Sequence, residues 1–133
     1  MTDRVTQVRD SLESWQVDAL LITSAANRRW LSGFTGSAGR LLVTRDRAIL
    51  AADSRYWEQA AHQAPQFEIH RLKGEKDDTA KFLQMSGVER IGIEARHVSL
   101  AEYSALKREK GFRWRALPTT VEPFRAVKTA DEL

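Results

Sequence analysis

The sequence predicts an α/β domain built around one mixed β-sheet, and three observations support this fold class. The chain has 133 residues, 42% of them hydrophobic, which suits one domain with a core and is too few for two. Short apolar runs of strand length alternate with amphipathic stretches of helical spacing. Two of the runs are close enough to form an antiparallel hairpin, so the sheet is expected to contain both strand directions.

The first elements are a helix, a central strand and a helical turn. Apolar residues recur at helical spacing over residues 2–15, which predicts an amphipathic helix; they are Val5, Val8, Leu12 and Trp15. Residues 18–23 form a short run that is largely apolar, typical of a strand buried on both faces. Asn27 can then cap a short helical turn over residues 28–31.

The middle of the chain predicts a hairpin, a helix and a further strand. Residues 41–44 and 48–51 are apolar runs around a three-residue polar loop, a spacing that suits an antiparallel pair. Asp53 or Ser54 can cap the helix that follows, and Pro65 lies beyond its end. Residues 67–72 are the next predicted strand.

The last third repeats the alternation and brings the predicted strands to six. Asp78 is expected to cap a short helix before the strand at residues 90–94. Ser99 and Glu102 have the spacing of a capping box, which opens a helix whose Leu100, Tyr103 and Leu106 keep helical spacing. Residues 112–117 form the last strand, and another helix is expected to begin at Thr129, within a turn of the chain end.

Composition excludes several classes of function. The 21 basic residues exceed the 18 acidic ones by only three, so no polyanion partner is required. The absence of cysteine excludes disulfides and thiolate sites, which fits a reducing compartment, and the cytoplasm is expected. No run approaches the ~18 apolar residues of a membrane span. Interspersed acids also argue against a nucleic-acid surface made by Arg28, Arg29, Trp30, Arg40, Arg45 and Arg47.

Few residues form a pattern that predicts chemistry. The three histidines are scattered, so no metal site is expected; they are His62, His70 and His97. Gly33, Gly36 and Gly39 recur every third residue, but the Gly-Lys-Ser/Thr ending of a phosphate-binding loop is absent. Their expected role is a tight turn with positive φ angles, which lining a pocket could accompany.

Residues 53–57, with the sequence DSRYW, combine a carboxylate, a guanidinium and two aromatic rings between a predicted strand and a predicted helix. Such junctions often carry ligand contacts in α/β domains. A capped helix with an Asp–Arg surface pair explains the same residues equally well. Both interpretations remain open at this point.

Three stretches resemble the amino-terminal domain of the creatinase, prolidase and Xaa-Pro aminopeptidase family. Residues 27–37, NRRWLSGFTGS, are similar to its Asn-x-x-Tyr-Leu-Thr-Gly-Phe-x-Gly-Ser pattern, with Trp30 for tyrosine and Ser32 for threonine. Residues 53–60, DSRYWEQA, are similar to the Asp-x-Arg-Tyr-x-x-Gln-Ala motif of the aminopeptidase P branch. Residues 124–133, FRAVKTADEL, look like the segment that leads into the catalytic domain.

The resemblance implies a fold and an incomplete enzyme. Residues 1–124 would form the family's domain, a six-stranded mixed sheet of ribonuclease H-like type with helices on both faces. Residues 125–133 would begin the connection to a "pita-bread" catalytic domain. In the family that second domain holds two divalent metal ions, commonly manganese, and all the catalytic residues. No metal ligand or catalytic residue therefore carries over, and this chain alone is expected to be inactive.

The resemblance also implies a role and partners. In the family this domain contributes to homodimers, packs with its own catalytic domain and restricts access of proline-containing peptides to the active site. The expected edge residues are Arg28, Phe34, Asp53, Arg55 and Tyr56. An arginine or tyrosine there can hold a peptide carbonyl or carboxylate, and an aromatic face can pack on a proline ring.

Two alternatives remain beside this hypothesis. The domain could stand alone as a ligand- or protein-binding module, without metal. The parent could also be a creatinase-like amidinohydrolase acting on a small guanidino compound, because the amino-terminal domains of the two branches look alike. The Asp-x-Arg-Tyr motif favours the peptidase branch.

Overall fold

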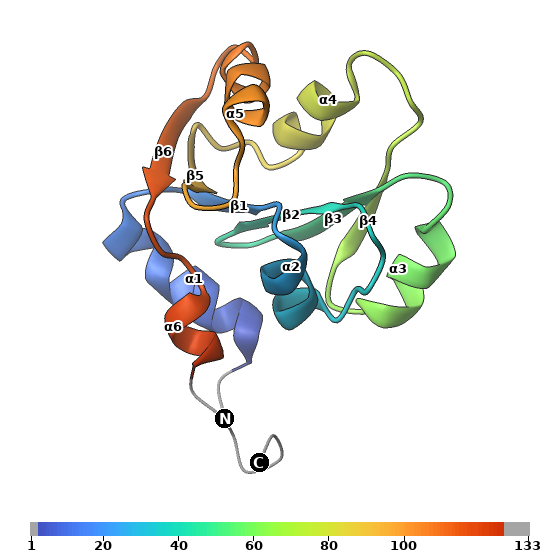
Figure 1. Ribbon diagram of the computed structural model, residues 1–133, viewed down its shortest axis with the longest axis horizontal. Helices are drawn as coiled ribbons and strands as arrows, with labels where there is room; N and C mark the ends of the chain where they lie inside the picture. The colour runs from blue at the N-terminus through green and yellow to red at the C-terminus, as the bar shows by residue number, and fades with distance from the viewer. Residues whose placement is uncertain (1–2, 127–133) are drawn as a thin grey trace.

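A computed structural model describes residues 3–126 as one six-stranded sheet with helices on both faces (Figure 1). The strands are β1 (Ala19–Ile22), β2 (Arg40–Thr44), β3 (Ala48–Ala52), β4 (Glu68–Arg71), β5 (Arg90–Glu94) and β6 (Arg113–Leu117). The helices are α1 (Arg4–Trp15), α2 (Ala25–Ser32), α3 (Trp57–Gln63), α4 (Asp78–Gln84), α5 (Leu100–Lys107) and α6 (Glu122–Arg125). The predicted mixed α/β fold is confirmed.

The strand order is β4-β3-β2-β1-β5-β6, so β1 is central as its apolar sequence predicts. Strand β2 runs antiparallel to both β1 and β3, while the pairs β1–β5, β3–β4 and β5–β6 are parallel. Five strands therefore share one direction, and their carboxyl ends meet at one edge of the sheet. The predicted hairpin is the β2–β3 pair.

Each face of the sheet is covered by its own set of helices. In Figure 1, helices α1, α2, α3 and α6 lie on one face and helices α4 and α5 on the other. Successive side chains of β1 alternate between the two cores, as strand geometry requires: Leu20 and Ile22 pack with α1, whereas Ala19 and Leu21 pack on the side of α4. Both cores are fully apolar at their centres.

Two helices have well-defined ends, and one of these ends, the capping box of α5, was predicted. At α1 the Asp3 carboxylate accepts a hydrogen bond from the Thr6 N–H, and Gln16 closes the helix in the left-handed region. At α5 the predicted capping box is present, with Ser99 and Glu102 bonded reciprocally. These ends are decided by groups within a few residues of one another.

Three predicted caps are wrong. In each case another residue holds the N-cap position of the helix. Helix α2 begins earlier, at Ala25, and its cap is Ser24 rather than Asn27. Asp53 and Ser54 do not cap α3, since the Asp53 carboxylate bonds Arg55 instead. Asp78 accepts three loop N–H groups, from Lys73, Gly74 and Glu75, and does not cap α4.

Other differences lie at the edges of the domain. Leu100, expected on the inner side of α5, is 86% exposed, because only Leu106 of this short helix is buried. Helix α6 was not expected, and the helix expected from Thr129 lies outside the described residues. Over residues 3–126 no helix has both the length and the apolar character needed to cross a membrane.

Candidate functional site

Both sequence motifs lie at the edge of the sheet where the parallel strands end. The chain leaves β1 at Thr23 and enters α2, and it leaves β3 at Asp53 and turns into α3. The carboxyl ends of such strands are the usual place for ligand contacts in open α/β sheets. This edge is therefore the candidate functional site.

The structure brings all five expected site residues into one chain of contacts. The Arg28 guanidinium lies 6.0 Å from the Phe34 ring centroid, and the Phe34 ring meets the Tyr56 ring edge to face at 5.7 Å. Arg55 lies 5.0 Å from the Tyr56 ring centroid and pairs with Asp53 at 2.9 Å. Residues from two separate motifs thus form one continuous cluster.

Arg28 and Phe34 are the buried half of this cluster. Arg28 is 3% exposed, and its guanidinium donates to the carbonyl oxygens of Thr23, Gly36 and Gly39 at 2.9 to 3.1 Å. Burial lowers the pKa of Arg28, while the Glu94 carboxylate nearby opposes that shift. Phe34 is 1% exposed. These two residues support the edge from beneath and are not part of its exposed surface.

The glycine loop, residues 33–39, fits closely around Phe34. Gly33 and Gly39 have φ angles of 84° and 155°, so the predicted positive φ is confirmed at both. Gly36 has no positive φ; a Cβ added there would lie 2.2 Å from the Phe34 ring, so it must be small for a packing reason. The loop is shaped around the ring as well as by its turn.

Helix α3 holds the outer side of the glycine loop. The Thr35 N–H donates to the Gln63 side chain at 3.0 Å, and the Gln59 and Gln63 amides both donate to the Thr35 hydroxyl. Gln59 belongs to the second sequence motif and Thr35 to the first. The two motifs are therefore held together by polar as well as aromatic contacts.

Asp53, Arg55 and Tyr56 are the outer half of the cluster: Arg55 is exposed, and Asp53 and Tyr56 are half-buried. The Arg55 side chain is 66% exposed, and its hydrogen bond lowers the pKa of Asp53 below the ordinary value. A hydrogen bond with the Ser37 hydroxyl lowers the pKa of Tyr56 in the same way. Beside them is an open pocket of about 440 Å³, where Trp57 and Lys73 join Asp53 and Arg55. The pocket and the outer half of the cluster therefore offer cationic hydrogen-bond donors and aromatic rings, which are groups that can bind a ligand.

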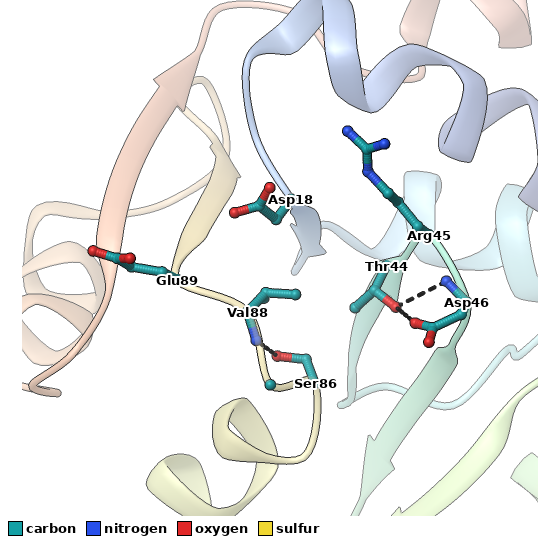
Figure 2. A pocket seen from close by; sticks show the side chains of 8 residues that line it. Asp18, Thr44, Arg45, Asp46, Ser86, Val88 and Glu89 are labelled. Atoms are coloured by element: carbon teal, nitrogen blue, oxygen red, sulfur yellow. Dashed lines mark hydrogen bonds between the residues drawn. The ribbon is translucent and has the colours of Figure 1, made fainter.

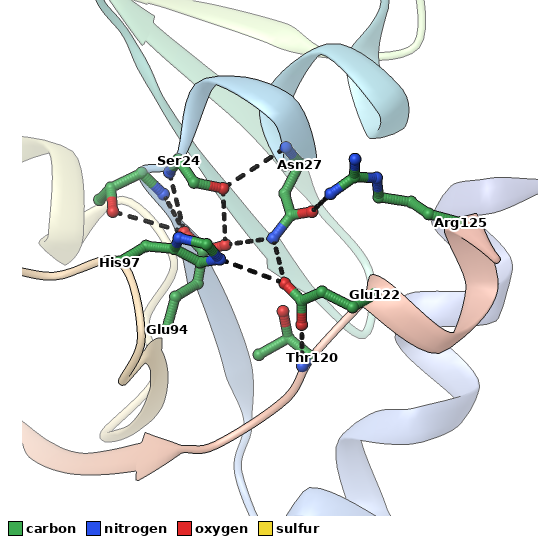
Figure 3. A network of polar contacts seen from close by, with 8 residues as sticks. Ser24, Asn27, Glu94, His97, Thr120, Glu122 and Arg125 are labelled. Atoms are coloured by element: carbon green, nitrogen blue, oxygen red, sulfur yellow. Dashed lines mark hydrogen bonds and ion pairs between the residues drawn. The ribbon is translucent and has the colours of Figure 1, made fainter.

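A second polar cluster, not predicted from the sequence, lies at the same edge (Figure 3). The Glu94 carboxylate is 1% exposed and accepts the N–H groups of Thr23 and Ser24, at 2.6 and 2.9 Å, and the Ser24 hydroxyl. The Asn27 side-chain N–H₂ donates to Glu94 and to Glu122, at 2.6 Å each. His97 faces Glu122 at 3.4 Å.

Glu94, His97 and Glu122 are also residue types that bind metals, and their ligand atoms lie within 4.8 Å of one another. The histidine that looked isolated in the sequence is thus beside two carboxylates. However, the Asn27 amide lies between those carboxylates and bonds both. The arrangement is a hydrogen-bonded hub. The only sequence signal for this hub was Glu94, a carboxylate residue at the end of a predicted strand.

The opposite edge of the sheet has a pocket of different character. It encloses about 600 Å³ among residues from the starts of β1 and β5 and the β2–β3 turn, including Asp18, Arg45 and Glu89 (Figure 2). Asp18 is engaged by Arg90 at 2.8 Å, and that hydrogen bond lowers the pKa of Asp18. None of the residues expected to act on a ligand lies here.

Comparisons with known proteins agree on one family. The family model described as "Creatinase/Prolidase N-terminal domain" matches residues 4–127. The chain is 32% identical to the uncharacterized peptidase YqhT of Bacillus subtilis, over 98% of this chain and 37% of that protein. It is 36% identical to mouse Xaa-Pro aminopeptidase 2 over 53% of this chain, which is 12% of that protein. The chain thus spans well under half of these relatives.

Solved structures share the fold as well. The Xaa-Pro dipeptidase from Bacillus anthracis superposes with a TM-score of 0.92 at 32% identity, over 97% of this chain and 37% of that one. The N-terminal domain of the cytoplasmic peptidase PepQ from Mycobacterium tuberculosis superposes with a TM-score of 0.75 at 33% identity, over 89% of this chain and 93% of that one. The expected likeness in fold to this family is confirmed.

Proposed function

The chain belongs to the creatinase/prolidase N-terminal domain family, and from this premise we propose that it is the non-catalytic domain of an Xaa-Pro peptidase. The parent enzyme hydrolyses the peptide bond before proline. In this proposal the present domain packs against a catalytic domain of the same protein, contributes to a homodimer and limits which peptides reach the active site.

The observation that carries the proposal is the outer half of the cluster, the exposed Arg55 with the half-buried Asp53 and Tyr56. Arg55 and Tyr56 stand on a support that fixes their position, because Phe34 and Arg28 beneath them are buried and the glycine loop is bonded to α3. A rigid base preorganises a binding surface and reduces the ordering cost of binding. Mobile surface side chains would not serve a gate as well.

The chemistry of these residues suits a peptide that contains proline. A guanidinium such as that of Arg55 donates strong hydrogen bonds to a peptide carbonyl or carboxylate. The ring of Tyr56 offers an apolar face to a proline ring. Hydrolysis itself is assigned to the catalytic domain. In this proposal that domain holds two divalent metal ions, for which manganese is the first choice. The protein is proposed to work in the cytoplasm.

The experiment that tests the proposal is Xaa-Pro peptide hydrolysis with added Mn²⁺, run on this chain and on the full product of its gene. Activity in the full product alone supports the assignment. Activity in this chain would mean that residues 1–133 contain a catalytic site, and the non-catalytic role would be wrong. Activity in neither would remove the peptidase assignment.

A further inference from the structure

Helix α6 is held to the domain by apolar contacts at its start and by polar contacts of two of its side chains. It has four residues, none of them buried, and a helix this short is not stable by itself in water. Its apolar contacts come from Phe124, whose ring stacks on Trp30 of α2 at 6.4 Å, and from its N-cap residue Val121, which is fully buried in the core. Glu122 and Arg125 supply the polar attachments, so the orientation of α6 depends also on what those two side chains bond.

Both of these side chains meet at Asn27. The Asn27 N–H₂ donates to Glu122 at 2.6 Å, and the Asn27 carbonyl oxygen accepts from the Arg125 guanidinium at 2.8 Å. The same N–H₂ donates to Glu94 at 2.6 Å, which ties α6 to the end of β5 as well. Asn27 is fully buried and uses both ends of its amide (Figure 3).

The hydrogen bonds outweigh the cost of placing Glu122 here. Burial acts to raise the pKa of Glu122, yet the hydrogen bonds from the Thr120 N–H and from Asn27 lower it overall. The carboxylate is therefore stabilised in its ionised form at this position. The groups that face Asn27 are two carboxylates and one guanidinium, and only a side chain that both donates and accepts satisfies them.

We propose that Asn27 is a positioning residue that latches α6 onto α2 and so sets the direction in which the chain continues. Its neighbour on α2, Arg28, supports the outer half of the cluster. One short helix therefore fixes both the outer Arg55–Tyr56 edge and the exit of the chain. The functional consequence rests on the proposed function, because a catalytic domain is what this exit would orient.

The latch is tested first in this 133-residue chain by the variant Asn27→Asp. It replaces the shared donor by a third carboxylate facing Glu94 and Glu122. Amide hydrogen exchange of Phe124, Arg125 and Ala126, whose N–H groups bond within α6 and its first turn, should accelerate about tenfold or more. Ser104→Asp on α5 is the control, since it adds the same charge at an exposed position.

A rescue variant separates latching from general destabilisation. In Asn27→Asp with Glu122→Gln, the new amide can donate to Asp at 27 and still accept the Thr120 N–H, while Arg125 gains a charged partner. Protection of the α6 amides should return, although repulsion from Glu94 keeps the whole domain less stable. Three results would each contradict the proposed role of Asn27. The α6 amides could exchange without protection in the unaltered chain, exchange could be unchanged in Asn27→Asp, or protection could fail to return in the double variant.

The consequence is tested in the full product of the gene. Asn27→Asp should lower kcat/KM for an Xaa-Pro peptide, and the double variant should recover most of it, whereas a purely structural role predicts no recovery. Unaltered activity in Asn27→Asp would overturn the positioning role. If the unaltered full product has no peptidase activity, the proposed function fails, while the exchange measurements still decide the latch.

Discussion

Arg28 and Asn27 are adjacent on α2; the buried side chain of Arg28 bonds the nearby glycine loop, whereas that of Asn27 joins segments that are distant in the sequence. Arg28 organises the glycine loop through the carbonyls of Gly36 and Gly39. Asn27 connects β5 and α6 through Glu94, Glu122 and Arg125. Buried polar groups need such partners, because an unpaired one costs about 1–3 kcal/mol. At this scale the site is a set of buried hydrogen bonds beneath a few outer side chains, although the Arg28 Nε has no partner among the described residues.

Gly36 gives the first residue-scale prediction. Gly36→Ala places a methyl group 2.2 Å from the Phe34 ring, so the ring or the loop must move. Overpacking of this kind should lower the free energy of unfolding by about 1–3 kcal/mol, measured by urea denaturation. In a Phe34→Leu background the same substitution should cost clearly less. Equal costs in the two backgrounds would contradict the packing explanation.

His70 predicts a pH dependence of stability. Its ring stacks on Phe82, and burial lowers the pKa of His70 below 6.5, with Asp78 opposing and Lys81 adding to the shift. Because the unfolded chain binds the proton more readily, this contribution is present above pH 6.5 and is lost as the pH falls toward the folded pKa. Unfolding free energies between pH 7.5 and 5.5 should therefore decrease, and less steeply in His70→Gln. Parallel slopes would exclude His70 as the cause.

At the scale of elements, local chemistry decides most ends and tertiary contacts decide the rest. The α5 capping box and the left-handed end of α1 depend only on near neighbours, and the capping box was predicted from the sequence. The cap of α2 does not follow from the sequence, because the Asn27 side chain bonds Glu94, Glu122 and Arg125, and Ser24 caps the helix. The exposure of Leu100 has a related cause, since a helix packed by little more than Leu106 does not bury a full apolar stripe.

The α5 cap is the element-scale prediction. Ser99→Ala removes the hydroxyl that accepts the Glu102 N–H at 3.0 Å. Loss of such a cap should lower the free energy of unfolding by about 1 kcal/mol, measured by chemical denaturation. Ser104→Ala, within the same helix, is the matched control and should change stability little. A similar loss in both variants would show that the cap is not the cause.

For the whole molecule, the direction of five strands gathers both motifs and the hub at one edge. Six predicted strands in sequence order do not state which strands pair or in which direction. The antiparallel pairing of β2 with β1 and β3 and the parallel pairing of β1 with β5 place Asp53 and Glu94 at the same edge. The opposite edge has a pocket and its own ion pairs, such as Asp18–Arg90 and Arg47–Glu68, but neither sequence motif lies there. The proposed gate is therefore a property of the topology as much as of any motif.

Arg55 carries the prediction at this scale, in the full product of the gene. Arg55→Ala should raise KM for Xaa-Pro peptides about tenfold or more and change kcat little, because a binding contact is lost that is shared by ground and transition states. Arg113→Ala is the control: Arg113 is also exposed and paired, with Glu89, but lies on β6. Unchanged kcat and KM in Arg55→Ala would remove Arg55 from the gate.

The sequence by itself determined the fold class, the six strands, the hairpin and the family, because periodicity, turn residues and motifs are local signals. It also named Asp53, Arg55 and Tyr56 as candidate site residues, and their role stays a prediction. Only the tertiary structure decided that Arg28 and Phe34 lie beneath them, and that Asn27 bonds Glu94 and Glu122 instead of capping a helix. The physical reason is that a polar side chain bonds the best partner within reach, and for Asn27 those partners lie 67 and 95 residues away.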